Sequence, residues 1–206
     1  NTAVGSDALR TQSYVNGNVN WATDNTAIGY RALRVTQPTA NNNGYQNTAV
    51  GSQSMVTNTT GSFNTAVGYL TLNLNSTGNN NTAVGHTALR SNLVNDNTAV
   101  GGGVETVSAP MYSNTYATQN VAIGTDALYT QSYANGSAAW ATDNTAIGYY
   151  ALRLNQPTAN TNGYQNTAIG SQVLDANTTG SFNTAMGYFS LGANTTANIC
   201  IVNQNT

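Results

Sequence analysis

A five-residue motif, Asn-Thr-Ala-(Val/Ile/Met)-Gly, recurs ten times along this chain of 206 residues. Successive motifs begin 16 to 24 residues apart, and the only departure is Val121, which replaces threonine in the seventh copy. Self-similarity at such periods indicates a repeat architecture, in which each unit packs against its neighbours. We therefore expect ten similar coils. The motifs begin at Asn1, Asn25, Asn47, Asn64, Asn81, Asn97, Asn120, Asn144, Asn166 and Asn183.

A longer duplication contains the motif. Residues 1 to about 78 return from position 120 to about 197 at a constant offset of 119, and the long insertions are copied with them. The segment Trp-Ala-Thr-Asp at 21–24, for example, returns at 140–143. We therefore divide the chain into a first six-coil block, residues 1–119, and a second, incomplete copy, residues 120–206. The two blocks are expected to form one continuous solenoid.

The pattern within each unit indicates strands rather than helices. Asn, Thr and Gly recur inside every unit, where they disfavour a helix, and there is no apolar stripe with a period of 3.6 residues. The fourth motif position is always aliphatic, the fifth is always Gly, and Leu or Met follows four residues later, broken only by Glu105. We predict an all-β chain, a parallel β-roll or β-helix of about ten coils. Its core and turn positions are represented by Val4, Gly5, Leu9, Ile28, Gly29, Leu33, Val67, Gly68, Leu72, Ile147, Gly148 and Leu152.

Side chains alternate along a strand, so Thr and Val/Ile share one face while Asn, Ala and Gly share the other. We assign the face that carries the aliphatic residues to the core. Stacking in register places identical residues about 4.8 Å apart, which favours Asn and Thr ladders and penalises like charges. This penalty accounts for the low content of charged residues, which is only 6%.

Coils this thin bury little apolar surface by themselves. One Val or Ile and one Leu per coil, at about 1.5 to 3 kcal/mol each, hardly offset an ordering cost of about 1 to 2 kcal/mol per residue. We therefore expect the chain to associate with itself, as a homotrimer or by end-to-end stacking. The face of small Asn, Ala and Gly residues would let neighbouring chains approach closely.

The motifs Asn-Thr-Ala-Val-Gly and Asn-Thr-Ala-Ile-Gly resemble the head repeats of trimeric autotransporter adhesins, where a Val/Ala-Ile-Gly core begins each coil. They are also similar to repeats in phage and large-virus tail fibres and in bacterial surface proteins with tail-fibre domains. The resemblance covers residues 1 to about 197 and implies a left-handed parallel β-roll in a homotrimer that presents loops to a host surface. It places the chain outside the cell, on a cell or virion surface. The irregular coil lengths depart from the pattern.

Charge and composition argue against several partners. The chain has no lysine, its five arginines are scattered singly and its net charge is −2, so no cationic cluster is available for a phosphate backbone. No stretch approaches the roughly 18 apolar residues of a membrane span. The single cysteine, Cys200, can form neither a disulfide nor a thiolate metal site within one chain. We expect no nucleic acid and no membrane insertion.

Residues that could carry enzyme chemistry are sparse. The only histidine, His86, follows a motif glycine, in a position that other units fill with Ser, Tyr, Gly or Thr, so we expect it to be exposed. The repeated pairs Asp7/Asp126 and Asp24/Asp143 lie beside motif starts or turns, where Asp accepts local hydrogen bonds. No calcium-loop pattern occurs. We therefore predict no catalytic residue, no metal site and no cofactor, and a protein that is not an enzyme.

The long excursions from the coils are the expected place for recognition. They set aromatic rings among Asn, Ser and Gly, a mixture that stacks on sugar faces while it hydrogen-bonds hydroxyl groups. The alternative is that these rings fold over neighbouring coils and cover the core. Tyr45 and Tyr164, just before a motif Asn, are expected to pack at the turn. The candidate glycan-contacting residues are Tyr14, Trp21, Tyr133 and Trp140.

Three classes of function remain open from the sequence. We rank first a structural fibre or surface filament for attachment or adhesion, with itself and cell-surface glycans as partners. A carbohydrate-binding solenoid module comes second. An ice-binding β-solenoid comes third, because the Thr column supplies one Thr per coil and the predicted alternation turns it toward the core.

Overall fold

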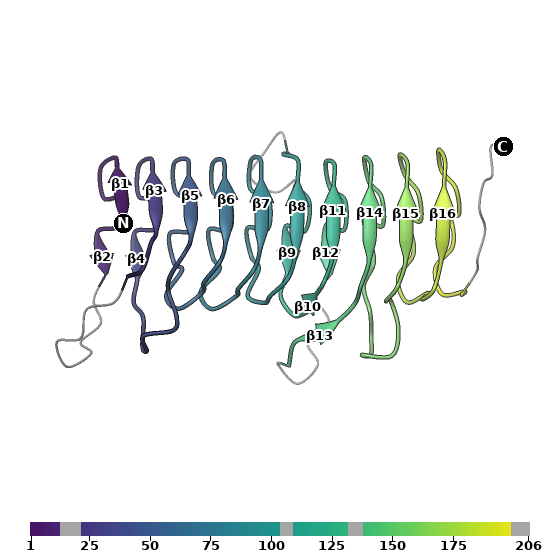
Figure 1. Cartoon of the computed structure of the whole chain (residues 1–206). Coiled ribbons are helices and arrows are strands. Elements are labelled where there is room, and N and C mark those ends of the chain that lie inside the picture. The colour runs from purple at the N-terminus through teal and green to yellow at the C-terminus, as the bar shows by residue number, and fades with distance from the viewer. Residues whose placement is uncertain (13–21, 104–108, 132–137, 199–206) are drawn as a thin grey trace.

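The computed structural model describes residues 1–12, 22–103, 109–131 and 138–198. Each motif forms one three-residue strand, and the ten strands pair in chain order into one parallel sheet (Figure 1). No helix occurs in these ranges. The strands are β1 (Thr2–Val4), β3 (Thr26–Ile28), β5 (Thr48–Val50), β6 (Thr65–Val67), β7 (Thr82–Val84), β8 (Thr98–Val100), β11 (Val121–Ile123), β14 (Thr145–Ile147), β15 (Thr167–Ile169) and β16 (Thr184–Met186).

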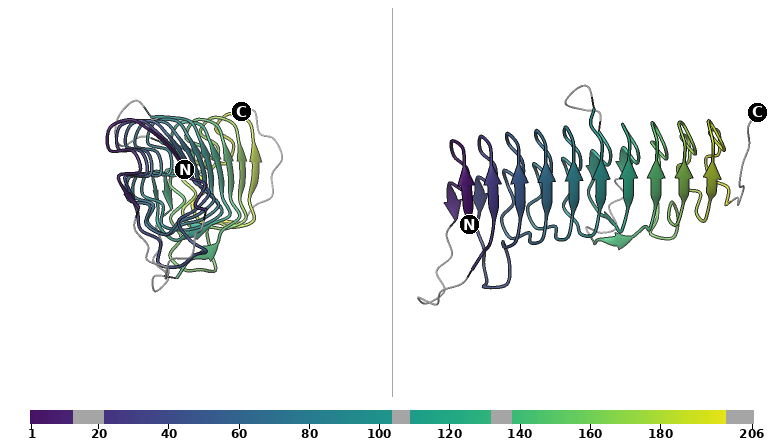
Figure 2. Two further views of the ribbon diagram at one scale, coloured as in Figure 1. Left: turned by 60° about the vertical axis from the view of Figure 1, so that its left-hand side comes forward. Right: turned by 45° about the horizontal axis from the view of Figure 1, so that its top comes forward.

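Every pair in this sheet keeps the motif in register. Thr26 lies opposite Thr48, Ala27 opposite Ala49, and Ile28 opposite Val50. The sheet passes without interruption from the first block to the second, because β8 pairs with β11. Viewed from other directions, the strands and their turns follow one another in a single row (Figure 2). The predicted all-β parallel β-roll is therefore confirmed, and the two blocks share one sheet.

Three two-stranded parallel sheets lie beside the main sheet, where coils of the longer kind neighbour one another. β2 (Thr11–Gln12) pairs with β4 (Val35–Thr36), and β9 (Ser113–Asn114) pairs with β12 (Thr130–Gln131). β10 (Ala117–Thr118) pairs with β13 (Trp140–Ala141). The stack thus keeps parallel pairing outside the motif as well.

Left-handed backbone at fixed positions turns each coil. In the second coil these positions are Asp24 before the motif (φ 48°), Arg31 two residues after the motif glycine (φ 56°) and Leu33 (φ 45°). Left-handed residues other than glycine are uncommon, yet here they recur from coil to coil. The motif glycine has a different role: Gly29 has φ 131°, and a Cβ there would lie 2.6 Å from the carbonyl oxygen of Gly51. Glycine is therefore required where successive coils approach most closely.

The core is a double column of alanine and leucine. Ala27 of the strand, and Ala32 and Leu33 of the following turn, are fully buried, and the same positions are buried in most other coils. The assignment of the strand faces made from the sequence was wrong: Ala and Asn point inward, whereas Thr and Val/Ile point outward. The physical reason is volume, since the thin coil already holds leucine from its opposite side and has room only for alanine from the strand.

The twelve representative positions divide accordingly. Leu33, Leu72 and Leu152 are fully buried, and Leu9 packs against the core from the end coil. The four glycines, Gly5, Gly29, Gly68 and Gly148, have φ between 130° and 136°. The aliphatic positions are not core: Val4, Ile28 and Val67 are exposed, and Ile147 is half-buried.

In the irregular sixth coil a methionine takes the place of the core leucine, at a later position than the spacing of the other coils predicts. Met111, with φ 47° and no exposed surface, occupies the place of leucine, ten residues after the motif glycine Gly101 rather than four. Its amide donates to the carbonyl of Ala127 over 3.0 Å, as leucine amides do in other coils. Glu105, expected to break the leucine column, lies outside the described residues. The coil therefore lengthens without losing its apolar side chain.

Buried asparagines stack along the whole solenoid. The side-chain Oδ1 of Asn47 accepts hydrogen bonds from the backbone N of Asn64 (3.0 Å) and from its Nδ2 (3.1 Å), while that Nδ2 also donates to the carbonyl of Gly78 (2.8 Å). A second ladder links Asn75 to Asn58 over 3.0 Å. Buried amides are costly unless they are satisfied, so these ladders fix the register from inside.

Candidate functional site

The outer face of the ten-stranded sheet carries two parallel columns of side chains, threonine at the first strand position and an aliphatic residue at the third. Threonine is half-buried in most coils and exposed in β1 and β7. Because the register is exact from strand to strand, each column repeats at about 4.8 Å. We call this surface the Thr/aliphatic face.

The aliphatic column of this face is unusually open to solvent for residues of its type. Exposed fractions are 40% for Ile28, 38% for Ile123 and 47% for Met186, and they reach 57% for Val4 in the end coil. A contiguous apolar strip of this kind on a folded chain marks an interaction surface more often than a free one. The strip extends over all ten strands of the main sheet.

A second outward surface is formed by the turns that follow the motif glycine, at the upper edge of the stack in Figure 1. The residue directly after the glycine is tyrosine in four coils, and these rings are 40 to 68% exposed. His86 occupies the same position in the fifth coil. The four tyrosines are Tyr30, Tyr69, Tyr149 and Tyr188.

Neighbouring side chains support each of these rings. The Arg31 guanidinium lies over the Tyr30 ring at 4.8 Å from its centroid. The ring of Tyr149 stacks on Tyr150 with centroids 3.8 Å apart, and Arg153 lies over the other ring of this pair, 4.3 Å from its centroid. These contacts hold the rings in place while they leave surface open to solvent.

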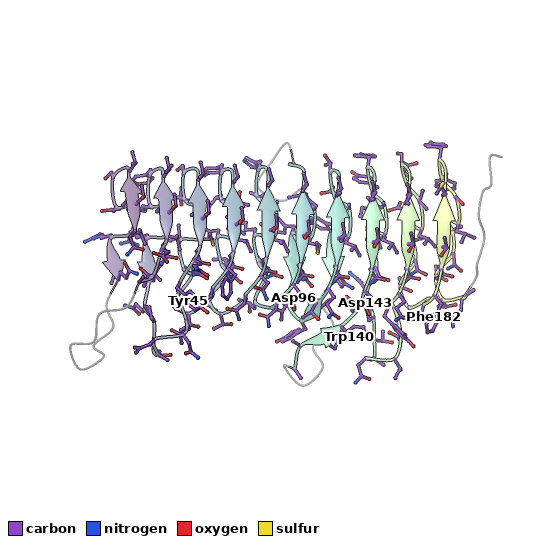
Figure 3. All side chains as sticks on the ribbon, viewed as in Figure 1. Tyr45, Asp96, Trp140, Asp143 and Phe182 are labelled. Carbon is purple, nitrogen blue, oxygen red and sulfur yellow. The ribbon has the colours of Figure 1, made fainter. Side chains whose placement is uncertain are left out.

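The aromatic residues that the sequence suggested for glycan contact are only partly placed. Tyr14, Trp21 and Tyr133 lie outside the described residues. Trp140 belongs to β13, on the lower side of the stack in Figure 3, and is half-buried; its backbone N donates to the carbonyl of Tyr116 over 3.0 Å. Trp140 is thus part of a small sheet, in keeping with the alternative that these residues cover neighbouring coils.

Tyr45 and Tyr164 pack at the turn, as predicted. Tyr45 meets Phe63 edge-to-face with centroids 4.8 Å apart, and Tyr164 meets Phe182 in the same way at 4.9 Å. The equal geometry in the two blocks shows that the duplication preserves these aromatic pairs. Both phenylalanines remain about half exposed.

The aspartates occupy turns rather than a catalytic cluster. Asp24 and Asp143 have φ 48° and 49°, and Asp7 and Asp126 have φ 59° and 56°, so all four sit at left-handed turn positions, which Asp tolerates. Burial raises the pKa of Asp126, and the nearby Arg153 and a backbone hydrogen bond from Ala109 partly oppose this shift. Within the described ranges no three His, Cys, Asp or Glu residues come together as a metal site would require.

Three of the Asn-x-Ser/Thr sequons are closed to modification in the folded chain. Asn58, Asn75 and Asn177 have no exposed surface, and their Nδ2 atoms donate to the glycine carbonyl three residues later over 2.9 to 3.0 Å. These asparagines form the second ladder. Their role as sequons is therefore incidental to their role in stacking.

The chain matches no protein-family profile, no curated protein and no solved structure. Among the described residues there is also no helix long and apolar enough to cross a membrane. The fold defines the class, a parallel β-solenoid, and the functional argument rests on its two outward surfaces.

Sequence reasoning placed the aliphatic face wrongly and expected the position after the motif glycine to be exposed without assigning it a role. The aliphatic motif position was assigned to the core because it is invariably apolar, although the alternation left either face possible. The tyrosine turn position was treated as a tolerant slot, although its tyrosines recur at matching places in the two blocks. That recurrence was the signal available in the sequence.

Proposed function

We propose that this chain is a segment of a structural fibre or surface filament, located outside the cell on a cell or virion surface and used for attachment. The observation that carries the proposal is the combination of one ten-stranded, in-register sheet with an uncovered aliphatic strip along its outer face. A rigid rod with a continuous apolar face is suited to lateral packing of identical chains. No enzymatic role is proposed.

The expected partner is a second and third copy of the same chain. The sequence suggested that small Asn, Ala and Gly residues would mediate this contact, but Ala27 and Asn25 are fully buried within the coil. The Thr/aliphatic face replaces them as the proposed contact. Association there would bury Ile28, Ile123 and their equivalents. Each Å² of apolar surface removed from water would stabilise the complex by about 25 cal/mol.

Light scattering on the purified chain tests this proposal. A monomer has a mass of 21.4 kDa, and we expect about three times that value or an end-to-end polymer. Val67→Lys combined with Ile123→Lys places charges on the face and should shift the mass to that of a monomer.

The matched control is Leu74→Lys combined with Leu93→Lys. These leucines are 40 and 41% exposed but lie outside the strands of the main sheet, so the mass should not change. A wild-type chain that is monomeric at all concentrations would contradict the proposed self-association.

The outward position of the threonine column favours one second candidate, an ice-binding solenoid. Regularly spaced threonine hydroxyls on an exposed face can order water in a lattice, and the face carries such a column with one interruption at Val121. If the chain is monomeric, thermal hysteresis and ice-crystal shaping should be measured. Thr65→Lys with Thr82→Lys should abolish both effects if the face binds ice.

A further inference from the structure

The four exposed tyrosines form two identical arrangements, one in each block. Tyr30 and Tyr69 follow the motif glycines of the second and fourth coils, with Ser52 in the coil between them. Tyr149, Ser171 and Tyr188 repeat this order in the eighth, ninth and tenth coils. We call each set of three a tyrosine cassette. Because one coil advances about 4.8 Å, the two tyrosines of a cassette are about 10 Å apart along the stack.

Hydrogen bonds between the turns fix this spacing. The carbonyl of Tyr30 accepts from the amide of Gln53 over 2.7 Å, and that of Ser52 accepts from Leu70 over 3.1 Å. In the second block the carbonyl of Tyr149 accepts from Gln172 over 2.7 Å. The turns therefore stack in register with the strands, and the cassette is preorganised rather than assembled on binding.

The rings of a cassette are also held from the side. Arg31 lies over Tyr30, and Tyr150 stacks on Tyr149, as described above. Tyr69 lies beside His86 of the next coil, with ring centroids 5.2 Å apart. Each tyrosine still exposes 40% or more of its surface. Each cassette thus presents two exposed aromatic platforms separated by the half-buried hydroxyl residue Ser52 or Ser171.

We propose that each tyrosine cassette binds an extended β-1,4-linked hexopyranose chain that lies along the solenoid axis. In such a glycan successive sugars are flipped, so every second ring presents the same face, and the length of one sugar is close to the coil spacing of about 4.8 Å. The two tyrosines would stack on alternate sugars. The serine and the glutamine that follows it, Gln53 or Gln172, belong to the coil between the two tyrosines, and their side chains would hydrogen-bond the hydroxyl groups of the middle sugar.

The surroundings favour a neutral glycan of this geometry. Three arginines gather around Asp7 beside the first cassette, whereas the second block keeps only Arg153, which pairs with Asp175, so the two cassettes share no cluster of cations that would select an acidic polymer. An α-linked glucan coils and does not present the same sugar face at the interval of two coils. Each cassette tyrosine follows the aliphatic residue of its coil by two positions, so the cassettes border the Thr/aliphatic face.

Binding of the intact chain to insoluble chitin and cellulose, with soluble amylose as the α-linked comparison, tests the proposal. We expect retention on one or both β-1,4-linked polymers and none on amylose, and the two polymers distinguish acetylated from plain glucose units. Replacing all four tyrosines with alanine should remove binding, each ring contributing about tenfold. Their replacement with phenylalanine should preserve most of the binding, because the platforms remain.

Two matched variants sharpen the test. Phe63→Ala with Phe182→Ala removes rings of similar exposure that precede the motif, at the opposite edge of the stack from the turns, where Phe182 is labelled in Figure 3, and should leave binding unchanged. Exchanging the middle and last positions, as Ser52→Tyr/Tyr69→Ser with Ser171→Tyr/Tyr188→Ser, keeps the composition but moves the rings to adjacent coils. Binding should then fall about as far as in the alanine variant.

A wild-type chain that binds neither polymer overturns the proposal. So does binding that survives the four alanine substitutions or the exchanged spacing. Circular dichroism and the thermal unfolding midpoint of each variant establish that it is folded before binding is compared.

Discussion

The two blocks carry the same aspartate in different surroundings. In the first block, Asp7 lies within 3.6 to 4.0 Å of the side-chain nitrogens of Arg10, Arg31 and Arg34, and all four side chains are 29% exposed or more. One carboxylate thereby separates three cations that the stack would otherwise bring together. Such exposed pairs are each weak, about 0 to 1 kcal/mol.

The second block replaces two of those arginines with rings. At the offset of 119, Arg10 and Arg31 become Tyr129 and Tyr150, and only Arg153 remains. Asp126 is 7% exposed, and its pKa is raised by burial. Arg153 instead pairs with Asp175 over 2.9 Å. The identical backbone therefore supports either an ionic or an aromatic cluster.

The comparison separates what the stack requires from what it permits. Most inward positions keep the same residue type in both blocks, because every coil must fill the same narrow interior, although the buried Ser54 returns as Val173. Outward turn positions change freely as long as like charges are not left adjacent. Five predictions sharpen this separation, in order of the expected effect.

The largest effect should be equal in the two blocks. Leu33→Ala and Leu152→Ala each remove a fully buried side chain at equivalent places, and each should lower the free energy of unfolding by about 2 to 5 kcal/mol. Urea unfolding monitored by circular dichroism measures the change. A difference above roughly 1 kcal/mol between the variants would show that the interiors are not equivalent.

Removing one asparagine of the buried ladder should lower the free energy of unfolding equally in both blocks, by less than the leucine substitutions do. Asn47→Ala removes the acceptor of the Asn64 amide and one of the two donors to the Gly61 carbonyl, and Asn166→Ala does the same to Asn183 and Gly180. Each variant should lose about 1 to 3 kcal/mol. Hydrogen exchange at the neighbouring strand amides should locate the loss. Unchanged exchange would contradict the ladder's role in register.

Replacing Asp7 and Asp126 with asparagine should change the free energy of unfolding in opposite directions. Asp126→Asn removes a buried carboxylate and should raise the free energy of unfolding at neutral pH by up to about 1 kcal/mol. Asp7→Asn should lower it by less than that, because three arginines lose an anion.

The stability difference between Asp126→Asn and the wild type should also depend on pH in a defined direction. The pKa of Asp126 is raised in the folded state, so the folded chain binds the proton of this carboxyl group more tightly than the unfolded chain does. The wild type therefore loses stability as the pH rises from the pKa of the unfolded state through that of the folded state. The advantage of Asp126→Asn should shrink as pH falls below this window. An advantage that is constant with pH would exclude burial of the charge as its cause.

The smallest effect should come from transplanting one ion pair. Val56 of the first block stands where Asp175 stands in the second, next to Arg34 rather than Arg153. Val56→Asp should gain no more than about 0.5 kcal/mol from a pair with Arg34. A double-mutant cycle with Arg34→Met measures the coupling. A coupling as strong at high salt as at low salt would argue against a screened surface pair.

The sequence predicted the number, phase and parallel pairing of the coils because the motif repeats without losing register. It could not tell which strand face is inside. Alternation is symmetric, and the apolar Val4 or Ile28 looked a better core residue than Ala27 until the leucine of the opposite turn was seen to fill the same space. The burial of Met111 was hidden for another reason, since an insertion moved it six residues beyond the expected position.

The outward surfaces were harder to predict because the binding proposed for them depends on the spacing between coils rather than on residue type. Tyr30 and Tyr149 are ordinary turn residues when each unit is read alone. Only the stacked turns, joined by hydrogen bonds such as Gln53 to Tyr30, convert their recurrence into a defined distance.

Because the coils stack in register, the length of this molecule can change without a change in its width. Gain or loss of whole coils would change the length of the stack in increments of about 4.8 Å while the remaining coils kept their structure. The doubled block of 119 residues has the form that such an event would leave behind. The length of the solenoid can thus change in evolution without a new fold having to be found.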